Sequence, residues 1–232
     1  DALMLISPAD HYIEDHAKFA LAIEQGQVAA REGAIVTFGV EPSWAETGYG
    51  YIRKGSPLKS WTGTFRVEEF VEKPLAPKAT EFVRSDRYYW NSGIFLLSAR
   101  VFLEALSHYE PAVVTACSAA IDRGAKDLEF FRLEAEAYAA APAISIDHAI
   151  MERTRVAAVV PLEAGWADLG SWAAIRNMLA ESDNGTVDVG DVVAKETSGS
   201  YVRSDGPLVV AYGVKDLAIV AAEDSILVSP MD

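Results

Sequence analysis

The chain has 232 residues, 50% of them hydrophobic and 23% charged, enough for one large folded domain or one domain with an appendage. Its 34 acidic residues outnumber 20 basic ones, and the formal charge of −14 opposes nucleic acid or an anionic membrane as a general partner. No apolar run approaches the roughly 20 residues that span a bilayer, and no signal-peptide pattern opens the chain. The single cysteine, Cys117, allows no internal disulfide, so we expect a cytoplasmic protein.

The first part of the chain alternates between strand and helix patterns. Residues 3–6 form an apolar run that ends at Ser7-Pro8, residues 14–32 have helical spacing followed by Gly33, and residues 34–40 return to a strand pattern. Such alternation is typical of an α/β layer, so we expect a Rossmann-like, mostly parallel sheet flanked by helices. Binding loops are then expected at the carboxyl ends of the strands.

The pattern changes near residue 183. Before it, strands are predicted over 65–72 and 156–160, and two strand-like pieces within 88–98 on either side of 91–93, with a bend or close backbone approach at Gly93. Helices are predicted over 99–108, 111–123, 128–137 and 171–181, the last with Ser171 as N-cap. From 187 to 228, short apolar runs alternate with turn residues, which predicts several short strands or the start of a β-helix-like stack. We therefore divide the chain into a domain over 1–182 and a small all-β unit over 183–232.

Six short segments occur in a fixed order and carry more information than any of them alone. They are PADH (8–11), ETGYGYI (46–52), FVEKP (70–74), WNSGIF (90–95), SIDHAIME (145–152) and GWADLGSW (165–172). Together they resemble the sugar-phosphate half of a nucleotide-sugar pyrophosphorylase, most closely the bacterial mannose-1-phosphate guanylyltransferases, a type often fused to a mannose-6-phosphate isomerase. The resemblance spans nearly the whole chain. It implies a nucleotidyltransferase fold of the GT-A-like kind and transfer of a guanylyl group from GTP to α-D-mannose 1-phosphate, giving GDP-mannose and pyrophosphate.

Two parts that the resemblance implies are not found in these 232 residues. One is a glycine-rich, arginine-containing loop after the first strand, whose backbone N–H groups would wrap the triphosphate. The other is an isomerase half with a His/Glu metal site, for which four histidines in all are too few. We therefore expect an N-terminally truncated nucleotidyltransferase domain that retains mainly the sugar-phosphate half of the site and shows little turnover alone. Truncation would also expose apolar surface, which favours a homo-oligomer.

Two aspartates are the expected metal ligands. Nucleotidyl transfer brings two anions together, so a cation that bridges the phosphates is needed, and Mg²⁺ prefers one or two carboxylates with water and phosphate oxygens. The resemblance assigns this role to Asp10, which follows a buried strand, and to Asp168, which lies just before a helix. We expect them to be neighbours at one edge of the sheet. The alternative for each is a capping residue of a turn or helix, because aspartate is common there.

Lys73 is the expected phosphate-binding residue, because an ammonium group at a strand end next to Pro74 offers a compact point charge. The resemblance assigns it that role, and it assigns sugar hydroxyls to its neighbour Glu72, whose carboxylate can accept two hydrogen bonds. The alternative is an ordinary surface pair of Glu72 and Lys73 at a strand end, which would contribute little stability.

The remaining substrate-binding candidates come from three of the motifs. Asn91 can donate and accept hydrogen bonds, which suits the recognition of one hydroxyl configuration. Gly48 and Gly50 allow backbone amides to face a ligand, and Tyr49 between them can pack against a sugar. The resemblance places Asp147 over the sugar. The alternatives are a turn asparagine, a flexible Gly-Tyr hairpin and, for Asp147, a helix N-cap.

Two alternatives to a guanylyltransferase stay open at this point. One is a catalytically inactive module that binds a sugar phosphate or serves assembly, and the other is a related pyrophosphorylase that acts on glucose 1-phosphate. The expected small-molecule partners are mannose 1-phosphate and GTP or GDP-mannose, with Mg²⁺ as cofactor, and neither nucleic acid nor membrane is an expected partner.

Overall fold

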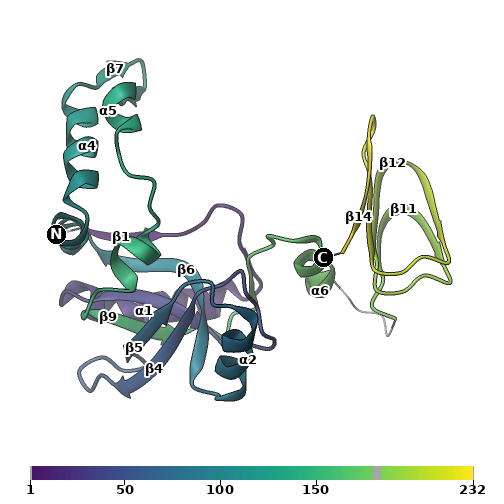
Figure 1. Ribbon diagram of the computed structural model, residues 1–232, viewed down its shortest axis with the longest axis horizontal. Helices are drawn as coiled ribbons and strands as arrows, with labels where there is room; N and C mark the ends of the chain where they lie inside the picture. Colours follow the sequence, from purple (N-terminus) through teal and green to yellow (C-terminus); the bar gives the residue numbers. More distant parts are fainter. Residues whose placement is uncertain (1, 180–183, 232) are drawn as a thin grey trace. The chain divides into compact units, whose positions relative to one another are not determined.

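The computed structural model describes residues 2–179 and 184–231, and its contacts group the chain into two compact units (Figure 1). The first unit comprises Asp1–Ala9 and Ile13–Trp166, and the second comprises Asp10–Tyr12 and Ala167–Asp232. The domain boundary predicted at 182/183 falls on residues outside those described. No helix among the described residues is long and apolar enough to cross a membrane.

A six-stranded sheet with the order β1-β6-β3-β9-β5-β4 forms the centre of the first unit. Its strands are β1 (Leu3–Ile6), β3 (Ile35–Val40), β4 (Tyr51–Pro57), β5 (Phe65–Val71), β6 (Tyr88–Ser98) and β9 (Ala157–Pro161). Strand β4 pairs with the beginning of β6 as well as with β5, so the sheet curls back on itself. A separate short pair joins β2 (Tyr12–Ile13) and β10 (Trp166–Ala167).

The prediction of a mostly parallel sheet is wrong for the described strands, although the α/β organisation holds. Only β3 and β9 pair in parallel, and the other pairings of this sheet are antiparallel. Strands β1 and β3 run in the same direction because both are antiparallel to β6, which lies between them. The strand-helix-strand alternation therefore predicted the direction of these two strands correctly but could not show that a later strand is inserted between them.

Six helical elements belong to the described part of the first unit. They are α1 (His16–Arg31), α2 (Ala76–Arg84), α3 (Ala99–Tyr109), α4 (Pro111–Asp122), α5 (Ala135–Ala139) and the single π-helical turn η1 (Asp147–Met151). Helices α4 and α5 extend away from the sheet (Figure 1). The N-cap of α1 is Asp15, whose carboxylate accepts from the Lys18 N–H at 3.0 Å. Gly33, with φ of 99°, follows the end of this helix as predicted.

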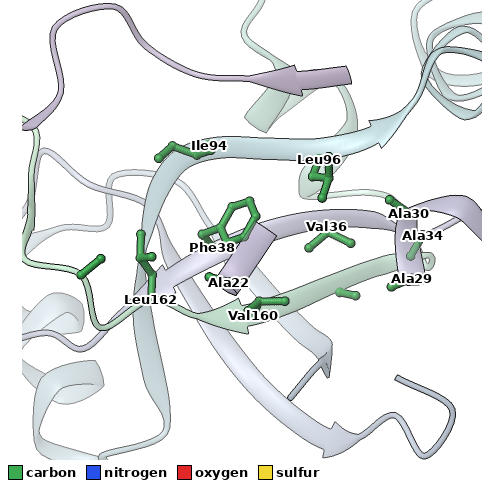
Figure 2. Close-up of a cluster of buried hydrophobic side chains, with 12 residues drawn as sticks. Ala22, Ala29, Ala30, Ala34, Val36, Phe38, Ile94, Leu96, Val160 and Leu162 are labelled. Atoms are coloured by element: carbon green, nitrogen blue, oxygen red, sulfur yellow. The ribbon is translucent and has the colours of Figure 1, made fainter. Parts of the chain in front are cut away.

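Small residues bring α1 close to the sheet. The buried residues of α1 are Ala22, Gly26, Ala29 and Ala30. They pack against Val36, Phe38 and Val160 of the central strands (Figure 2). A Cβ atom on Gly26 would lie only 3.1 Å from Val36 Cγ1, so the helix axis could not stay this near the sheet with a larger residue there.

The helix predicted over 128–137 is wrong in its first half. The strands β7 (Ala125–Asp127) and β8 (Phe130–Arg132) pair as an antiparallel hairpin, and α5 begins only at Ala135. Leu128 adopts φ of 54°, a left-handed conformation that is incompatible with a continuous right-handed helix. Spacing of apolar residues alone could not distinguish this hairpin from a helix, because short apolar runs fit both.

The second unit contains α6 (Trp172–Leu179) and a four-stranded sheet. Its strands β11 (Val187–Lys195), β12 (Tyr201–Tyr212) and β13 (Leu217–Ala221) pair in parallel, and β14 (Ile226–Pro230) returns antiparallel. Parallel pairing of consecutive strands fits the predicted β-helix-like stack, and 184–231 contain no helix. Trp172 stacks on Tyr201 with ring centroids 5.8 Å apart, which joins α6 to the sheet.

Candidate active site

Three strand ends bring Gly50, Glu72 and Asn91 together in the first unit. Tyr51 of β4 pairs with Val71 of β5 and also with Trp90 of β6. Gly50 directly precedes Tyr51, Glu72 follows Val71, and Asn91 follows Trp90 in the sequence. The Asn91 N–H donates to the Gly50 carbonyl oxygen at 2.7 Å. Residues that three separate motifs supplied thus form one cluster.

Asp147 joins this cluster through Asn91. The Asn91 Nδ2 donates to Asp147 Oδ1 at 2.9 Å, across 56 residues of sequence. The alternative of a capping role for Asp147 is wrong, because the residue is the first of η1 and Ile146 is the N-cap, with no side-chain cap bond. Burial raises the pKa of Asp147, and its contact with Asn91 opposes that shift. The geometry therefore directs this carboxylate toward the predicted sugar site.

Glu72 is a buried acid of the cluster, with a side chain only 10% exposed. Its Oε2 atom is buried and has no hydrogen-bond partner in the described part of the chain. Burial and the nearby charge of Asp147 both raise the pKa of Glu72. A buried acceptor without a partner is costly to maintain, so this atom is available to a ligand that donates a hydrogen bond.

Glu152, which sequence analysis left outside the site, holds the backbone of Glu72 in place. Its Oε1 accepts from the Glu72 N–H at 3.2 Å, and its Oε2 lies 3.2 Å from His148 Nδ1. The motif SIDHAIME contains both His148 and Glu152, but its spacing does not indicate that Glu152 contacts Glu72, which follows β5 and lies 80 residues earlier. The η1 turn is thus attached to the end of β5.

Lys73 has an unusual backbone conformation, with φ of 45°. A left-handed conformation costs a non-glycine residue roughly 1–2 kcal/mol, and such positions often belong to functional sites. The Lys73 side chain is 63% exposed, and its Nζ lies 3.7 Å from Glu72 Oε1. The backbone turn therefore leaves the ammonium group at the edge of the cluster and accessible to an anion.

The loop from Trp44 to Gly50 is held by Glu46. The Gly48 N–H donates to Glu46 Oε1 at 2.9 Å, and the Trp44 indole donates to Glu46 Oε2 at 3.1 Å. The Gly48 amide is thus engaged within the loop. The Tyr49 ring packs edge-on against Trp90 and Trp166, each with centroids 5.4 Å away. This ordered packing argues against a flexible Gly-Tyr hairpin.

The second unit contains the two predicted metal ligands, Asp10 and Asp168. Burial lowers the pKa of His11, and the negative charges of Asp168 and Asp10 oppose that shift, so both carboxylates lie near one imidazole. The alternative of Asp168 as the cap of α6 is wrong, because Ser171 Oγ accepts from the Ala174 N–H at 3.1 Å. Asp168 Oδ1 instead accepts from the Gly170 N–H at 3.2 Å.

Asp10 and Asp168 supply two carboxylates, a ligand type that divalent metal ions take in proteins. Within residues 2–179 and 184–231, no group of three or more His, Cys, Asp or Glu is arranged to hold a metal. Mg²⁺ needs only one or two carboxylates when water and substrate phosphates complete its shell, whereas zinc sites use three or four protein ligands.

A replacement of Glu72 by glutamine is expected to stabilise the fold at neutral pH. The pKa of the Glu72 carboxyl is raised in the folded state, so the folded chain holds the carboxyl proton more tightly than the unfolded chain does. The free energy of unfolding therefore falls as the pH rises from the ordinary carboxyl pKa through the raised pKa of Glu72. Glutamine carries no charge and avoids that loss. Thermal unfolding at several pH values should show a gain for the variant that disappears under acidic conditions.

The matched control is Glu24→Gln on an exposed position of α1, which changes the net charge equally. It is expected to leave the pH dependence of the melting temperature as in the wild type. A Glu72→Gln variant that melts below the wild type at neutral pH would contradict the account of Glu72 as a buried, destabilising charge.

The family model described as nucleotidyl transferase matches residues 1–184. The chain belongs to the nucleotidyl transferase family. This membership confirms the predicted nucleotidyltransferase fold and makes the chain an enzyme-family member, as the motifs indicated.

One relative is mannose-1-phosphate guanylyltransferase of Escherichia coli (strain K12), which is 44% identical to this chain over 231 residues. The match covers 99% of this chain and 48% of the relative. Xanthan biosynthesis protein XanB of Xanthomonas campestris pv. campestris (strain B100) is 40% identical over 232 residues, 100% of this chain and 49% of that protein. The chain thus spans about half the length of the curated relatives it matches.

A solved structure supports the same assignment. The crystal structure described as a mannose-1-phosphate geranyltransferase from Thermus thermophilus matches this nucleotidyl transferase with a TM-score of 0.86 and 33% sequence identity. The match covers 99% of this chain and 66% of that one. Both the α/β part and the β-rich C-terminal part therefore have a counterpart in a related protein.

Proposed function

We propose that the protein carrying this chain is a mannose-1-phosphate guanylyltransferase. The observation that carries the proposal is the cluster of Glu72, Asn91 and Asp147 beside the exposed ammonium group of Lys73. A buried acceptor, an amide and a second carboxylate suit the hydroxyl groups of a sugar, and the neighbouring cation suits its phosphate. The names of relatives at 40–44% identity support mannose as the sugar and GDP-mannose as the product.

In the proposed reaction, an oxygen of mannose 1-phosphate attacks the α-phosphorus of GTP. A bond forms between that oxygen and the α-phosphorus, the bond from the α-phosphorus to the bridging oxygen of the β-phosphate breaks, and pyrophosphate leaves. Lys73 would hold the attacking phosphate and reduce its charge repulsion with the triphosphate. Glu72, Asn91 and Asp147 would orient the sugar ring, so that the phosphate approaches in line.

Asp10 and Asp168 would hold Mg²⁺, which would supply charge neutralisation for the phosphates when bound. In the protein that carries this chain, an Asp168→Asn variant is expected to lose the Mg²⁺-dependent part of its GTP affinity, a decrease of about tenfold, because an amide oxygen is a weaker ligand for this ion than a carboxylate. Calorimetric titration of GTP with and without Mg²⁺ measures this. Asp188→Asn, an exposed position of β11, is the control, and an unchanged Mg²⁺ effect in Asp168→Asn would contradict the assignment.

The function is tested by binding and by product formation. Mannose 1-phosphate is expected to bind this chain more tightly than glucose 1-phosphate in calorimetry, and the protein that carries the chain is expected to release pyrophosphate from GTP only when mannose 1-phosphate is present. Preference for glucose 1-phosphate would favour a related pyrophosphorylase. Binding without pyrophosphate release would favour a catalytically inactive sugar-phosphate-binding or assembly module. A cytoplasmic location and a homo-oligomeric state stay part of the proposal.

A further inference from the structure

Thr37 is a polar residue in the middle of β3 that the proposed function does not use. It is fully buried, and its neighbours Val36 and Phe38 belong to the apolar cluster under α1 (Figure 2). Because side chains alternate along a strand, Thr37 points to the other face of the sheet. There its Oγ1 donates to Asn91 Oδ1 at 2.9 Å.

The Asn91 amide is therefore held from both sides. Its oxygen accepts from Thr37, and its nitrogen donates to Asp147 Oδ1, with both bonds at 2.9 Å. An ionised carboxylate can only accept, so the nitrogen of the amide must face Asp147 and the oxygen must face Thr37. A rotation of the amide by half a turn would place two oxygens against each other at Asp147.

This orientation leaves specific groups for a ligand. The amide nitrogen has two N–H bonds, and only one is used by Asp147 among the described residues. The side chains of Asn91 and Glu72 both border Gly50, since a Cβ atom on that glycine would lie 2.5 Å from Glu72 Oε2 and 3.2 Å from Asn91 Cβ. An amide N–H and an unpartnered carboxylate oxygen on neighbouring side chains suit one hydroxyl group, which can accept from the first and donate to the second.

We propose that Thr37 is a positioning residue that sets sugar specificity by holding the oxygen of the Asn91 amide in place, while Asp147 sets the direction of that amide. This inference rests on the proposed function. Thr37 does not touch the ligand: it acts through Asn91, whose free N–H can serve only a hydroxyl of one configuration at that place. Through the hydrogen bonds that link Thr37, Asn91 and Asp147, the buried Thr37 hydroxyl then affects the relative affinity for sugar 1-phosphates that differ at one carbon.

The test compares Thr37→Val, which keeps the shape but removes the donor, with Thr37→Ser, which keeps the donor. Calorimetric binding of mannose 1-phosphate and glucose 1-phosphate is measured for each chain. The valine variant leaves the Asn91 oxygen buried without a donor, so the amide is held by Asp147 alone and can shift from its wild-type position. We expect its affinity for mannose 1-phosphate to fall by about tenfold and its preference over glucose 1-phosphate to shrink by a similar factor, with serine restoring both.

A purely structural role for Thr37 would lower the melting temperature and leave the preference between the two sugars unchanged, and that result would overturn the inference. The side-chain amide protons of Asn91, observed by NMR in the free chain, give a readout without ligand. We expect the chemical shifts of these protons to change in the valine variant, because the amide oxygen loses the bond from Thr37, and to stay close to wild type in the serine variant, whereas unchanged shifts in the valine variant would refute the role of that bond.

The outcomes separate this inference from the proposed function. A wild-type chain that prefers another sugar 1-phosphate refutes the guanylyltransferase proposal, yet the valine variant must still lose that preference if Thr37 positions Asn91. A valine variant with wild-type affinities and preference refutes the role of Thr37 and leaves the guanylyltransferase proposal standing. A wild-type chain that binds no sugar 1-phosphate refutes both.

Discussion

Replacing Lys73 with alanine is expected to weaken the binding of mannose 1-phosphate about 30- to 100-fold. A hydrogen bond between an ammonium group and a phosphate contributes about 2–3 kcal/mol, which corresponds to that factor. In the wild type, Lys73 Nζ lies 3.7 Å from Glu72 Oε1 and offsets the charge of this buried carboxylate. The alanine variant lacks that cation, so the phosphate would approach an unbalanced negative charge. Calorimetry at low and moderate salt measures the loss, which should shrink as salt screens the wild-type contact.

Two variants make this prediction specific. Lys73→Arg retains the charge and is expected to recover part of the affinity, although a guanidinium places its donors differently from an ammonium. Lys59→Ala removes an exposed lysine from the turn between β4 and β5, outside the cluster, and is expected to bind as the wild type does. If Lys59→Ala weakened binding as much as Lys73→Ala, a general loss of positive charge would explain the effect, and Lys73 would have no particular role.

The members of the candidate site were predictable from short motifs, but their connections were not. Glu72, Asn91 and Asp147 come from three separate segments, and only the pairing of Tyr51 with both Val71 and Trp90 shows how two of these segments meet. Strand register is decided by packing between distant parts of the chain, which a single sequence does not display. The bonds that link Asn91 to Thr37 and Asp147 therefore became visible only in the structure.

Thr37 illustrates the limit of sequence reasoning most clearly. In the segment AIVTFGV a threonine is a typical strand residue, because its branched side chain suits a pleated sheet, and nothing marks its hydroxyl as part of a site. Likewise, Glu152 reads as the polar end of a helical turn, although it accepts from the Glu72 N–H. Both residues act across more than 50 positions of sequence, where spacing contains no information about contact.

The pairing of the strands was beyond prediction for a related reason. Alternating patterns predict that β1 and β3 run the same way, and they do, yet β6 lies between them and is antiparallel to both. This insertion matters for the site, because the beginning of β6 contains Asn91 and lies next to both β3 and β4. In a purely parallel sheet, the carboxyl ends of strands would supply the binding residues, whereas here a candidate binding residue lies near the amino end of an antiparallel strand.

Replacing Gly50 with alanine is expected to abolish detectable binding of mannose 1-phosphate and to destabilise the fold by about 1–3 kcal/mol, the usual cost of overpacking. The added Cβ atom would lie 2.5 Å from Glu72 Oε2, closer than atoms can approach without movement. Glu72 cannot move away freely, because its side chain is buried and its N–H is held by Glu152. The carboxylate must therefore shift from the position in which its Oε2 would accept a hydrogen bond from the sugar. Calorimetry and thermal unfolding measure the two effects.

The matched control is Gly55→Ala on the same strand. There the new Cβ would lie 2.6 Å from Glu68 Cγ, an atom of an exposed side chain that can swing into solvent, and 3.1 Å from the Arg66 carbonyl oxygen. The Gly55→Ala variant is expected to lose some stability but no affinity for the sugar phosphate. Comparison of the Gly50→Ala and Gly55→Ala variants therefore separates damage to β4 from displacement of Glu72 in the candidate site. Wild-type affinity in Gly50→Ala would mean that Glu72 and Asn91 do not enclose the sugar, and the proposed site would have to lie elsewhere in the chain.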